Sequence, residues 1–292
     1  MERYARLGAS DVRAAAMPFS AYDDKRSRGR ALIVGGSAKY HGAPVLCAIS
    51  ALRIGAGYAK LLVPSIIINP VRALSPNIIV GALGHSRIVY GKAALSEIER
   101  CDAMAIGMGI GNGEAAAGAA GRLIGAAAEA GKNVIVDADA IYALKRLKCA
   151  GNARKRIIAT PNGPEFERLC KRRLGSIGLE GKVELASQCA RELGITVVLK
   201  GHSTVVTDGR RTKVCTPKSS ALATMGTGDV LAGMICGLCA RGAGAFEAAG
   251  AGVYLHCAIG DMLERIEGNH AIATDAIDLI PSVIKDFDKI IH

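Results

Sequence analysis

The 292-residue sequence lacks tryptophan and contains only four phenylalanines and seven tyrosines. So few aromatic side chains argue against a protein that binds single strands of nucleic acid by stacking bases. The sequence also lacks an uncharged apolar run of about 18 residues, the length of a membrane-spanning helix. The best candidate, 61–68, is short and interrupted by Pro64. We therefore expect no membrane-spanning segment, and the mixed charges after Met1 do not resemble a signal peptide.

Several catalytic motifs are missing as well. No HExxH pair of histidines, no GxSxG and no GxxxxGK[ST] occurs, which weighs against a zinc protease, an α/β-hydrolase and a P-loop nucleotidase. The nine cysteines are odd in number and do not show the spacing of a disulfide-rich domain. Cys236 and Cys239 lie in a helical apolar pattern, so we interpret them as core residues. We expect a reducing, cytoplasmic location.

Positive charge is in excess, since 37 basic and 26 acidic residues give a formal net charge of +11. Ten of the basic residues fall between Lys145 and Arg173. Such a field attracts polyanions, either nucleic acid or a ligand with several phosphates, although a solvated surface has the same composition. Charge alone does not choose between these partners.

Short apolar runs alternate with helical patterns along most of the chain, which predicts an α/β fold with a parallel sheet covered on both faces. The expected strands are 31–34, 58–63, 77–80, 103–106, 134–136, 157–159 and 196–199, and the expected helices are 42–54, 92–100, 114–130 and 183–193. A hairpin is expected around Asp208-Gly209, followed by three helices from 226 to about 290. We divide the chain into a helical N-terminal extension, 1–28, and one catalytic domain, 29–292.

The strongest local signal is Gly226-Thr227-Gly228-Asp229, which precedes an apolar helical pattern. Glycines at a helix start leave backbone N–H groups and the positive end of the helix dipole free to receive a phosphate. Asp229 falls in the first turn, where it can accept a proton from a substrate hydroxyl. The alternative is an ordinary helix start with a capping Asp. We predict that Gly226, Thr227 and Asp229 form the catalytic group.

A second candidate group follows the expected strand 196–199. It consists of Lys200, Gly201, His202, Ser203 and Thr204. A lysine and hydroxyl groups at the carboxyl end of a strand suit contact with phosphate. An ordinary polar turn explains the same residues, so this motif is weak by itself.

Other polar residues and glycines also follow strands. Glu165 stands at an expected helix start, where its carboxylate can act through water on Mg²⁺ bound to nucleotide phosphates, or simply cap the helix. Asp137 and Asp139 end another strand and either orient a ligand or cap the next helix. The glycines of 35–36 and 107–111 follow strands too, but short glycine patterns of this kind are common.

Taken in order, the motifs resemble those of the ADP/ATP-dependent NAD(P)H-hydrate dehydratases, a family of the ribokinase-like superfamily related to carbohydrate kinases. The resemblance runs from about Gly29 to the ATDAIDLIP segment at 273–281. It rests on these motifs in chain order: GGS, YxGAP, AIGMGIG, VDADA, TPxxxEF, VVLKGxxT, ATxGTGDVLAG and EAAxxGVYLH. It implies a three-layer sandwich, with a mostly parallel central sheet flanked by helices on both faces.

The resemblance also implies an activity. Members of this family are understood to repair hydrated NADH or NADPH (NADHX and NADPHX) by phosphorylating the ring hydroxyl from ADP or ATP and then eliminating phosphate. It implies that Ala43 and Gly109 line the hydrated dinucleotide and that Asp229 is the base. The nucleotide would meet residues 200–204 and Gly228. Mg²⁺ and a homotetramer are implied as well, with Glu165 as our candidate for the metal.

The sequence departs from the family pattern in four places. Asn162 stands where the family has a substrate-contacting His, which makes Asn162 a candidate substrate residue. Met225 replaces a Gly, Ser219 an Asn, and Tyr142 an Asn. These departures concern the fit of the substrate more than the phosphate chemistry.

Two other functions remain open at this point. The Asn162-x-x-Glu165 pattern also resembles that of sugar and vitamin kinases, so a small-molecule kinase is the alternative. The short step from 31–34 to the helix at 42 leaves no room for the β-lid of sugar kinases, although a lidless vitamin kinase passes this test. A non-catalytic nucleotide- or nucleic-acid-binding protein would use the positive charge but leaves Gly226–Asp229 unexplained. We therefore expect small-molecule partners rather than nucleic acid.

Overall fold

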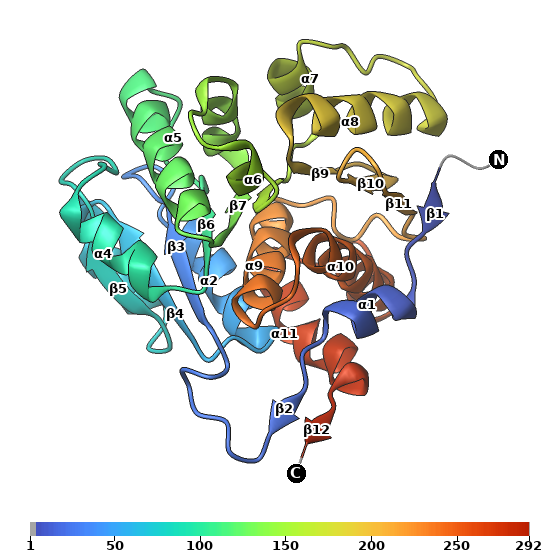
Figure 1. Cartoon of the computed structure of the whole chain (residues 1–292). Helices are drawn as coiled ribbons and strands as arrows, with labels where there is room; N and C mark the ends of the chain where they lie inside the picture. The colour runs from blue at the N-terminus through green and yellow to red at the C-terminus, as the bar shows by residue number, and fades with distance from the viewer. Residues whose placement is uncertain (1–3, 292) are drawn as a thin grey trace.

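The computed structural model describes residues 4–291, and its centre is a 10-stranded sheet in the order β1-β11-β10-β9-β8-β7-β6-β3-β4-β5 (Figure 1). The strands are β1 (Ala5–Arg6), β3 (Arg30–Val34), β4 (Tyr58–Val63), β5 (Ile79–Ala82), β6 (Ala103–Ile106), β7 (Asn133–Val136), β8 (Ile157–Ala159), β9 (Thr196–Leu199), β10 (Thr204–Thr207) and β11 (Thr212–Cys215). Within the described sheet only β10 runs antiparallel to its neighbours. The predicted mostly parallel sheet is confirmed.

Helices cover both faces of this sheet (Figure 1). Alternate residues of a strand point to opposite faces, and in β3 the side chains of Ala31 and Ile33 join one apolar cluster while Leu32 and Val34 join another. The first cluster includes residues of α1 (Ala9–Ala15), α2 (Ala43–Arg53), α3 (Ile68–Leu74), α9 (Thr227–Ala240), α10 (Ala245–Glu267) and α11 (Ala273–Ile284). The second includes residues of α4 (Lys92–Arg100), α5 (Glu114–Glu129), η2 (Ala138–Arg146), α6 (Gly151–Arg154), α7 (Gly163–Cys170) and α8 (Leu179–Leu193). The three-layer α/β sandwich is therefore confirmed.

The predicted elements from residue 29 onward are present with small shifts. β5 begins at Ile79 rather than at 77, and α8 begins at Leu179 rather than at 183. The three expected C-terminal helices are α9, α10 and α11. Two short turns of 3-10 helix, η1 (Ser65–Ile67) and η3 (Lys285–Phe287), complete the helical elements of the described chain.

The N-terminal segment differs from the expected helical extension. Within residues 4–28 the helix α1 is flanked by two short strands, β1 and β2 (Phe19–Ser20), and β2 pairs with β12 (Ile290–Ile291). β1 adds a parallel edge strand beside β11, and the Lys213 ammonium forms an ion pair with Asp11 of α1. The helical prediction for this segment was therefore wrong outside α1. Two-residue strands carry too little apolar pattern to be recognised in a sequence.

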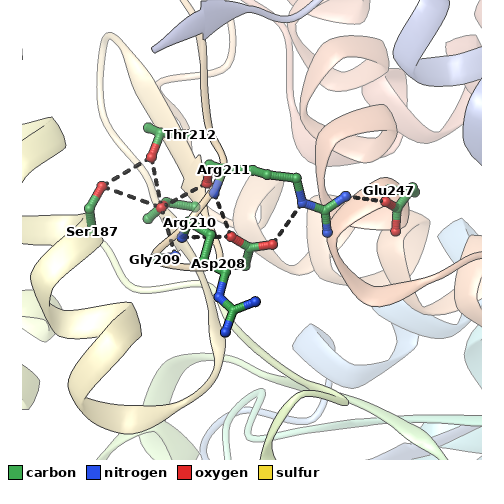
Figure 2. A network of polar contacts seen from close by, with 8 residues as sticks. Ser187, Asp208, Gly209, Arg210, Arg211, Thr212 and Glu247 are labelled. Atoms are coloured by element: carbon green, nitrogen blue, oxygen red, sulfur yellow. Dashed lines mark hydrogen bonds and ion pairs between the residues drawn. The ribbon is translucent and has the colours of Figure 1, made fainter. Parts of the chain in front are cut away.

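The predicted hairpin around Asp208-Gly209 joins β10 to β11 and is fixed on two sides (Figure 2). Oδ1 of Asp208 accepts from the backbone N–H of Arg211 at 2.7 Å, and the Arg211 guanidinium donates to Oδ2 of Asp208 and to Glu247 of α10. On the other side, Ser187 Oγ of α8 lies 3.0 Å from Thr212 Oγ1. These bonds hold β10 and β11 to the helices that flank them, and β9 lies beside β10.

One pair of cysteines forms a disulfide, which differs from the expectation of a reducing location. Cys170 at the end of α7 forms a disulfide with Cys189 of α8, 19 residues later. Cys236 and Cys239 of α9 are free and buried, as predicted for core residues. No helix within residues 4–291 is long and apolar enough to cross a membrane.

Candidate functional site

The candidate residues gather where the parallel strands end. β6, β7, β8 and β9 lie side by side in parallel, so the loops that follow them meet at one edge of the sheet. Those loops carry Gly109, Asp137, Asn162 and Lys200. Ligands of open α/β sheets bind outside this carboxyl edge.

The residue that precedes α9 is a glycine, and any other residue there would require its neighbours to move. Gly226 adopts φ +95°, which L side chains rarely adopt, and a Cβ there would lie 2.7 Å from Leu46 Cδ1 and 2.9 Å from Ala273 Cβ. The Thr227 hydroxyl donates to the carbonyl oxygens of Leu222 (2.8 Å) and Thr224 (2.9 Å). The structure thus gives Gly226 and the Thr227 side chain a role in shaping the turn, and Thr227 and Gly228 border a cavity.

The start of α9 combines backbone donors with a lysine from β9. The first N–H of α9 that bonds to a carbonyl oxygen four residues earlier is that of Val230, which donates to Gly226. The amides of 227–229 therefore have no partner of this kind within the helix. A Cβ on Gly228 would lie 3.2 Å from Lys200 Nζ. Helix N-terminal amides and an ammonium group at one point form a site for an anion.

Lys200 is held by the carboxylate of Asp137, a contact that was not predicted from the sequence. Its Nζ donates to Asp137 Oδ1 at 2.7 Å, and the Thr160 hydroxyl donates to the same oxygen at 2.7 Å. Asp137 is 2% exposed. The sequence left two roles open for Asp137, orienting a ligand or capping a helix. The observed role, a bond to Lys200, is neither of these. Asp137 fixes the direction of the lysine.

The charges of this group act on one another. Burial raises the pKa of Asp229 to about 7, with the negative charges of Asp137 and Glu165 adding to the rise and Lys200 opposing it. Burial would lower the pKa of Lys200, but the neighbouring carboxylates outweigh it and raise that pKa. Lys200 therefore stays charged, and the pKa of Asp229 lies near neutral pH, in the range that suits a general base.

Asn162 and Glu165 form a reciprocal cap at the start of α7. Asn162 Oδ1 accepts from the Glu165 N–H at 2.9 Å, and Glu165 Oε2 accepts from the Asn162 N–H at 2.9 Å. Burial raises the pKa of Glu165, against the lowering effects of Lys200 and of the Asn162 N–H. Glu165 thus caps α7, as the second of its two predicted roles requires. Only Oε2 takes part in the cap, and Oε1 does not.

Most of the candidate nucleotide residues border one cavity of about 470 Å³. Its lining includes Lys200, Gly201, His202, Thr204 and Gly228. Ser203 is the exception, since its hydroxyl lies 2.8 Å from Thr216 Oγ1 and the residue borders a neighbouring cavity with Lys182.

His256 of α10 was not among the candidate residues named from the sequence. It borders the same cavity as Lys200, and its Nε2 is buried without a hydrogen-bond partner. Burial lowers the pKa of His256 to about 4, against a hydrogen bond with the Thr227 backbone, so the ring is neutral. The apolar neighbours of this histidine in the sequence concealed its position at the cavity wall.

The candidate dinucleotide residues lie on or directly after two loops that pack together. Ala43 is the first residue of α2, and Gly109 adopts φ +69° in the loop after β6. A Cβ on Gly109 would lie 2.6 Å from Tyr40 Cβ, and the Gly36 N–H donates to the Met108 carbonyl at 2.8 Å. The loops after β3 and β6 therefore hold one another in place.

Comparison with known proteins agrees with this arrangement. The family model of NAD(P)H-hydrate dehydratases matches residues 31–282. An ADP-dependent (S)-NAD(P)H-hydrate dehydratase from Cenarchaeum symbiosum is 33% identical over 287 residues, covering 97% of this chain and 98% of the relative. A second dehydratase of that description, from Nitrosopumilus maritimus, is 33% identical over 271 residues, covering 91% and 92%.

Solved structures show the same likeness. An ADP/ATP-dependent NAD(P)H-hydrate dehydratase from Bacillus subtilis, co-crystallized with ATP and Mg²⁺, is 25% identical with a TM-score of 0.78, covering 99% of this chain and 100% of that one. A ribokinase-like superfamily protein from Enterococcus faecalis has a TM-score of 0.84 at 23% identity, covering 99% and 98%, and shows the fold alone. This chain, with Asp229 and Lys200 at the carboxyl edge of a ribokinase-like sheet, belongs to the NAD(P)H-hydrate dehydratase family.

Proposed function

We propose that this protein dehydrates hydrated NADH and NADPH at the expense of ADP or ATP, with Asp229 as the base. The observation that carries the proposal is the position of Asp229. Its pKa is raised to about 7 at the start of α9, beside an ammonium group directed by a buried carboxylate. Family membership supplies the substrate class, since the related dehydratases are named for this reaction.

In the proposed reaction the Asp229 carboxylate takes the proton of the ring hydroxyl. The freed oxygen forms a bond to the terminal phosphorus of the nucleotide, and the bond from that phosphorus to AMP or ADP breaks. The amides of 227–229 and the Lys200 ammonium stabilise the charge on the transferred group. The ring carbon–oxygen bond then breaks, phosphate leaves, and loss of a ring proton restores the dihydronicotinamide. NADH, orthophosphate and AMP or ADP should therefore appear in equal amounts.

We propose Mg²⁺ as the partner of the nucleotide. Among the described residues no group of three or more His, Cys, Asp or Glu side chains forms a metal cage. Mg²⁺ fits this pattern, because it is commonly held by one or two carboxylates, water and substrate phosphates. Glu165 would hold it, through the carboxylate oxygen outside the α7 cap. The bound ion would neutralise phosphate charge.

The pH dependence of turnover follows from the pKa of Asp229. The base acts when deprotonated, so kcat/KM should fall as pH decreases through about 7, approaching a tenfold loss per pH unit below it. Initial rates of NADH formation across pH, with the nucleotide saturating, measure this profile. A rate that stays constant down to a pH near the ordinary pKa of Asp would contradict the assignment.

Asn162→His tests the main departure from the family pattern. The imidazole should keep or raise kcat/KM for the hydrate, while loss of the α7 cap lowers the free energy of unfolding by about 1 kcal/mol. Asn162→Ala is the matched control, because it removes the same cap without adding the imidazole. Steady-state kinetics and urea denaturation separate the two effects. A collapse of activity in Asn162→His alone would show that Asn162 has another task.

We also propose a homotetramer, which the family resemblance suggested, and a cytoplasmic location, which the cysteine pattern suggested. Ile79, on the edge strand β5, is 53% exposed, and Leu74 and Ile66 nearby in the chain are exposed as well. An apolar edge of this kind supports contact between copies. Seven of the nine cysteines are free thiols, the usual state in a reducing compartment, and the Cys170–Cys189 disulfide is the exception.

A further inference from the structure

The basic residues between 145 and 173 differ in what their side chains contact. Arg154 donates to the carbonyl oxygens of Leu147 and Leu193, and Arg172 forms an ion pair of 2.6 Å with Glu192. Lys145 and Arg146 differ from these, because both border a cavity of about 340 Å³ between η2 and α5. Two of the ten basic residues of this segment thus border that cavity, together with the carboxylates of Glu114 and Asp139.

This cavity adjoins the loop that carries Gly109. Gly111 and Asn112 form part of its wall, and the Gly111 N–H donates to Asp139 Oδ2 at 2.8 Å. Asp139 follows Asp137, the partner of Lys200, by two residues. One short segment after β7 therefore links the cavity to the phosphoryl-transfer group. Gly109, the candidate dinucleotide residue, stands two residues before Gly111 in the same loop.

The lining has the chemistry that an adenosine phosphate needs. Ala117, Gly118 and Ala143 give an apolar wall, suited to a base. Asp139 offers carboxylate oxygens to ribose hydroxyls. In dinucleotide-binding sheets a carboxylate after a strand bonds the ribose 2′-hydroxyl of NAD, whereas an arginine nearby accommodates the 2′-phosphate of NADP, and this cavity has both kinds of group. The volume lies at the small end of ligand pockets, which suits half of a dinucleotide.

The two basic side chains are free to bind. Arg146 has one weak ion pair, 3.8 Å from Glu114, and these side chains are 87% and 93% exposed. Such a pair contributes little and yields readily to a phosphate. Lys145 has no ion pair within residues 4–291. On the far side of the cavity wall, the Arg168 guanidinium donates to the Tyr142 hydroxyl at 2.8 Å and holds that ring in place.

We infer that this cavity binds the adenosine end of the hydrated dinucleotide and that Lys145 and Arg146 recognise the 2′-phosphate that distinguishes NADPHX from NADHX. The inference rests on the proposed function for the identity of the substrate. It makes Lys145 and Arg146 specificity-determining residues of the dehydratase, at a distance from the transferred phosphoryl group. It predicts that the protein prefers NADPHX.

Substitution of the two basic residues tests this preference. In Lys145→Ala/Arg146→Ala the ratio of KM for NADPHX to KM for NADHX should rise roughly tenfold or more, with kcat unchanged, because charge-assisted bonds to phosphate are lost. Arg122→Ala is the matched control, since Arg122 lies on α5 but stacks on Tyr90 and does not border the cavity. An equal change in both KM values, or none, would overturn the inference.

A binding measurement separates this inference from the proposed function. With ADP and Mg²⁺ saturating the nucleotide cavity, calorimetry compares adenosine 2′,5′-bisphosphate with 5′-AMP. The wild-type protein should bind the bisphosphate roughly tenfold more tightly, and the double variant should lose that difference. A protein that turns over both hydrates without this difference overturns the inference alone. A protein that shows the difference but dehydrates neither hydrate keeps the cavity assignment and overturns the proposed reaction.

Discussion

Asp229→Asn is expected to reduce turnover of the hydrates by roughly 10²–10⁴-fold, the contribution of a positioned general base. The amide has the shape of the carboxylate but cannot take the hydroxyl proton. Nucleotide affinity should stay nearly intact, because the backbone amides of 227–229 and Lys200 remain. Rates of NADH formation and calorimetric titration with nucleotide measure the two quantities on one preparation.

A matched control exists for this substitution. Asp275 is the third residue of α11, as Asp229 is of α9, and its carboxylate accepts from the Ile272 N–H at 2.8 Å. Asp275→Asn changes the same chemical group at the same helical position and should leave turnover unchanged. If Asp229→Asn lost nucleotide binding as severely as turnover, Asp229 would be a structural residue of the turn and not the base.

Lys200→Ala is expected to have two effects at once. Loss of the ammonium should weaken nucleotide binding by roughly tenfold to a hundredfold, as for a charge-assisted hydrogen bond. It also leaves Asp137 buried without its cation, which should lower the free energy of unfolding by about 3–5 kcal/mol. Calorimetry with nucleotide and urea denaturation follow the two effects separately.

A second substitution distinguishes binding from stability. In Lys200→Ala/Asp137→Asn the buried charge is removed and the neutral amide can still accept from Thr160, so stability should recover while affinity does not. Lys182→Ala serves as the control for position, since Lys200 borders both cavities whereas Lys182 borders only the neighbouring one with Ser203. Unchanged affinity in Lys200→Ala with a loss in Lys182→Ala would move the nucleotide to that other cavity.

Much of the fold follows from the sequence because its strands are buried on both faces. A run such as 103–106 is apolar throughout, and glycines and helical patterns separate it from the next strand. The position of Asp229 in the first turn of α9 could be predicted as well, because the start of a helix is determined by residues that are adjacent in the sequence. Edge strands such as β1 escape prediction, since two residues at a sheet margin need no apolar pattern.

The contacts that organise the site were not predictable in the same way. Lys200 and Asp137 are 63 residues apart and meet because β7 and β9 flank β8 in the sheet, an order that local patterns do not specify. Ser203 precedes β10 and Thr216 follows β11, so the pairing of these two strands brings the two hydroxyl groups together. Cys170 and Cys189 likewise pair across two helices. Each contact depends on topology rather than on neighbouring residues.

The most direct test of the central claim is recovery of NADH absorbance from purified NADHX with Mg²⁺ and either ADP or ATP. The account predicts recovery that requires a nucleotide and is lost in Asp229→Asn, with orthophosphate released in equal amount. The nucleotide that supports recovery identifies the phosphate donor. Bound nucleotide without any recovery of NADH would contradict the dehydratase assignment and favour a small-molecule kinase, with Asn162 as the first residue to re-examine.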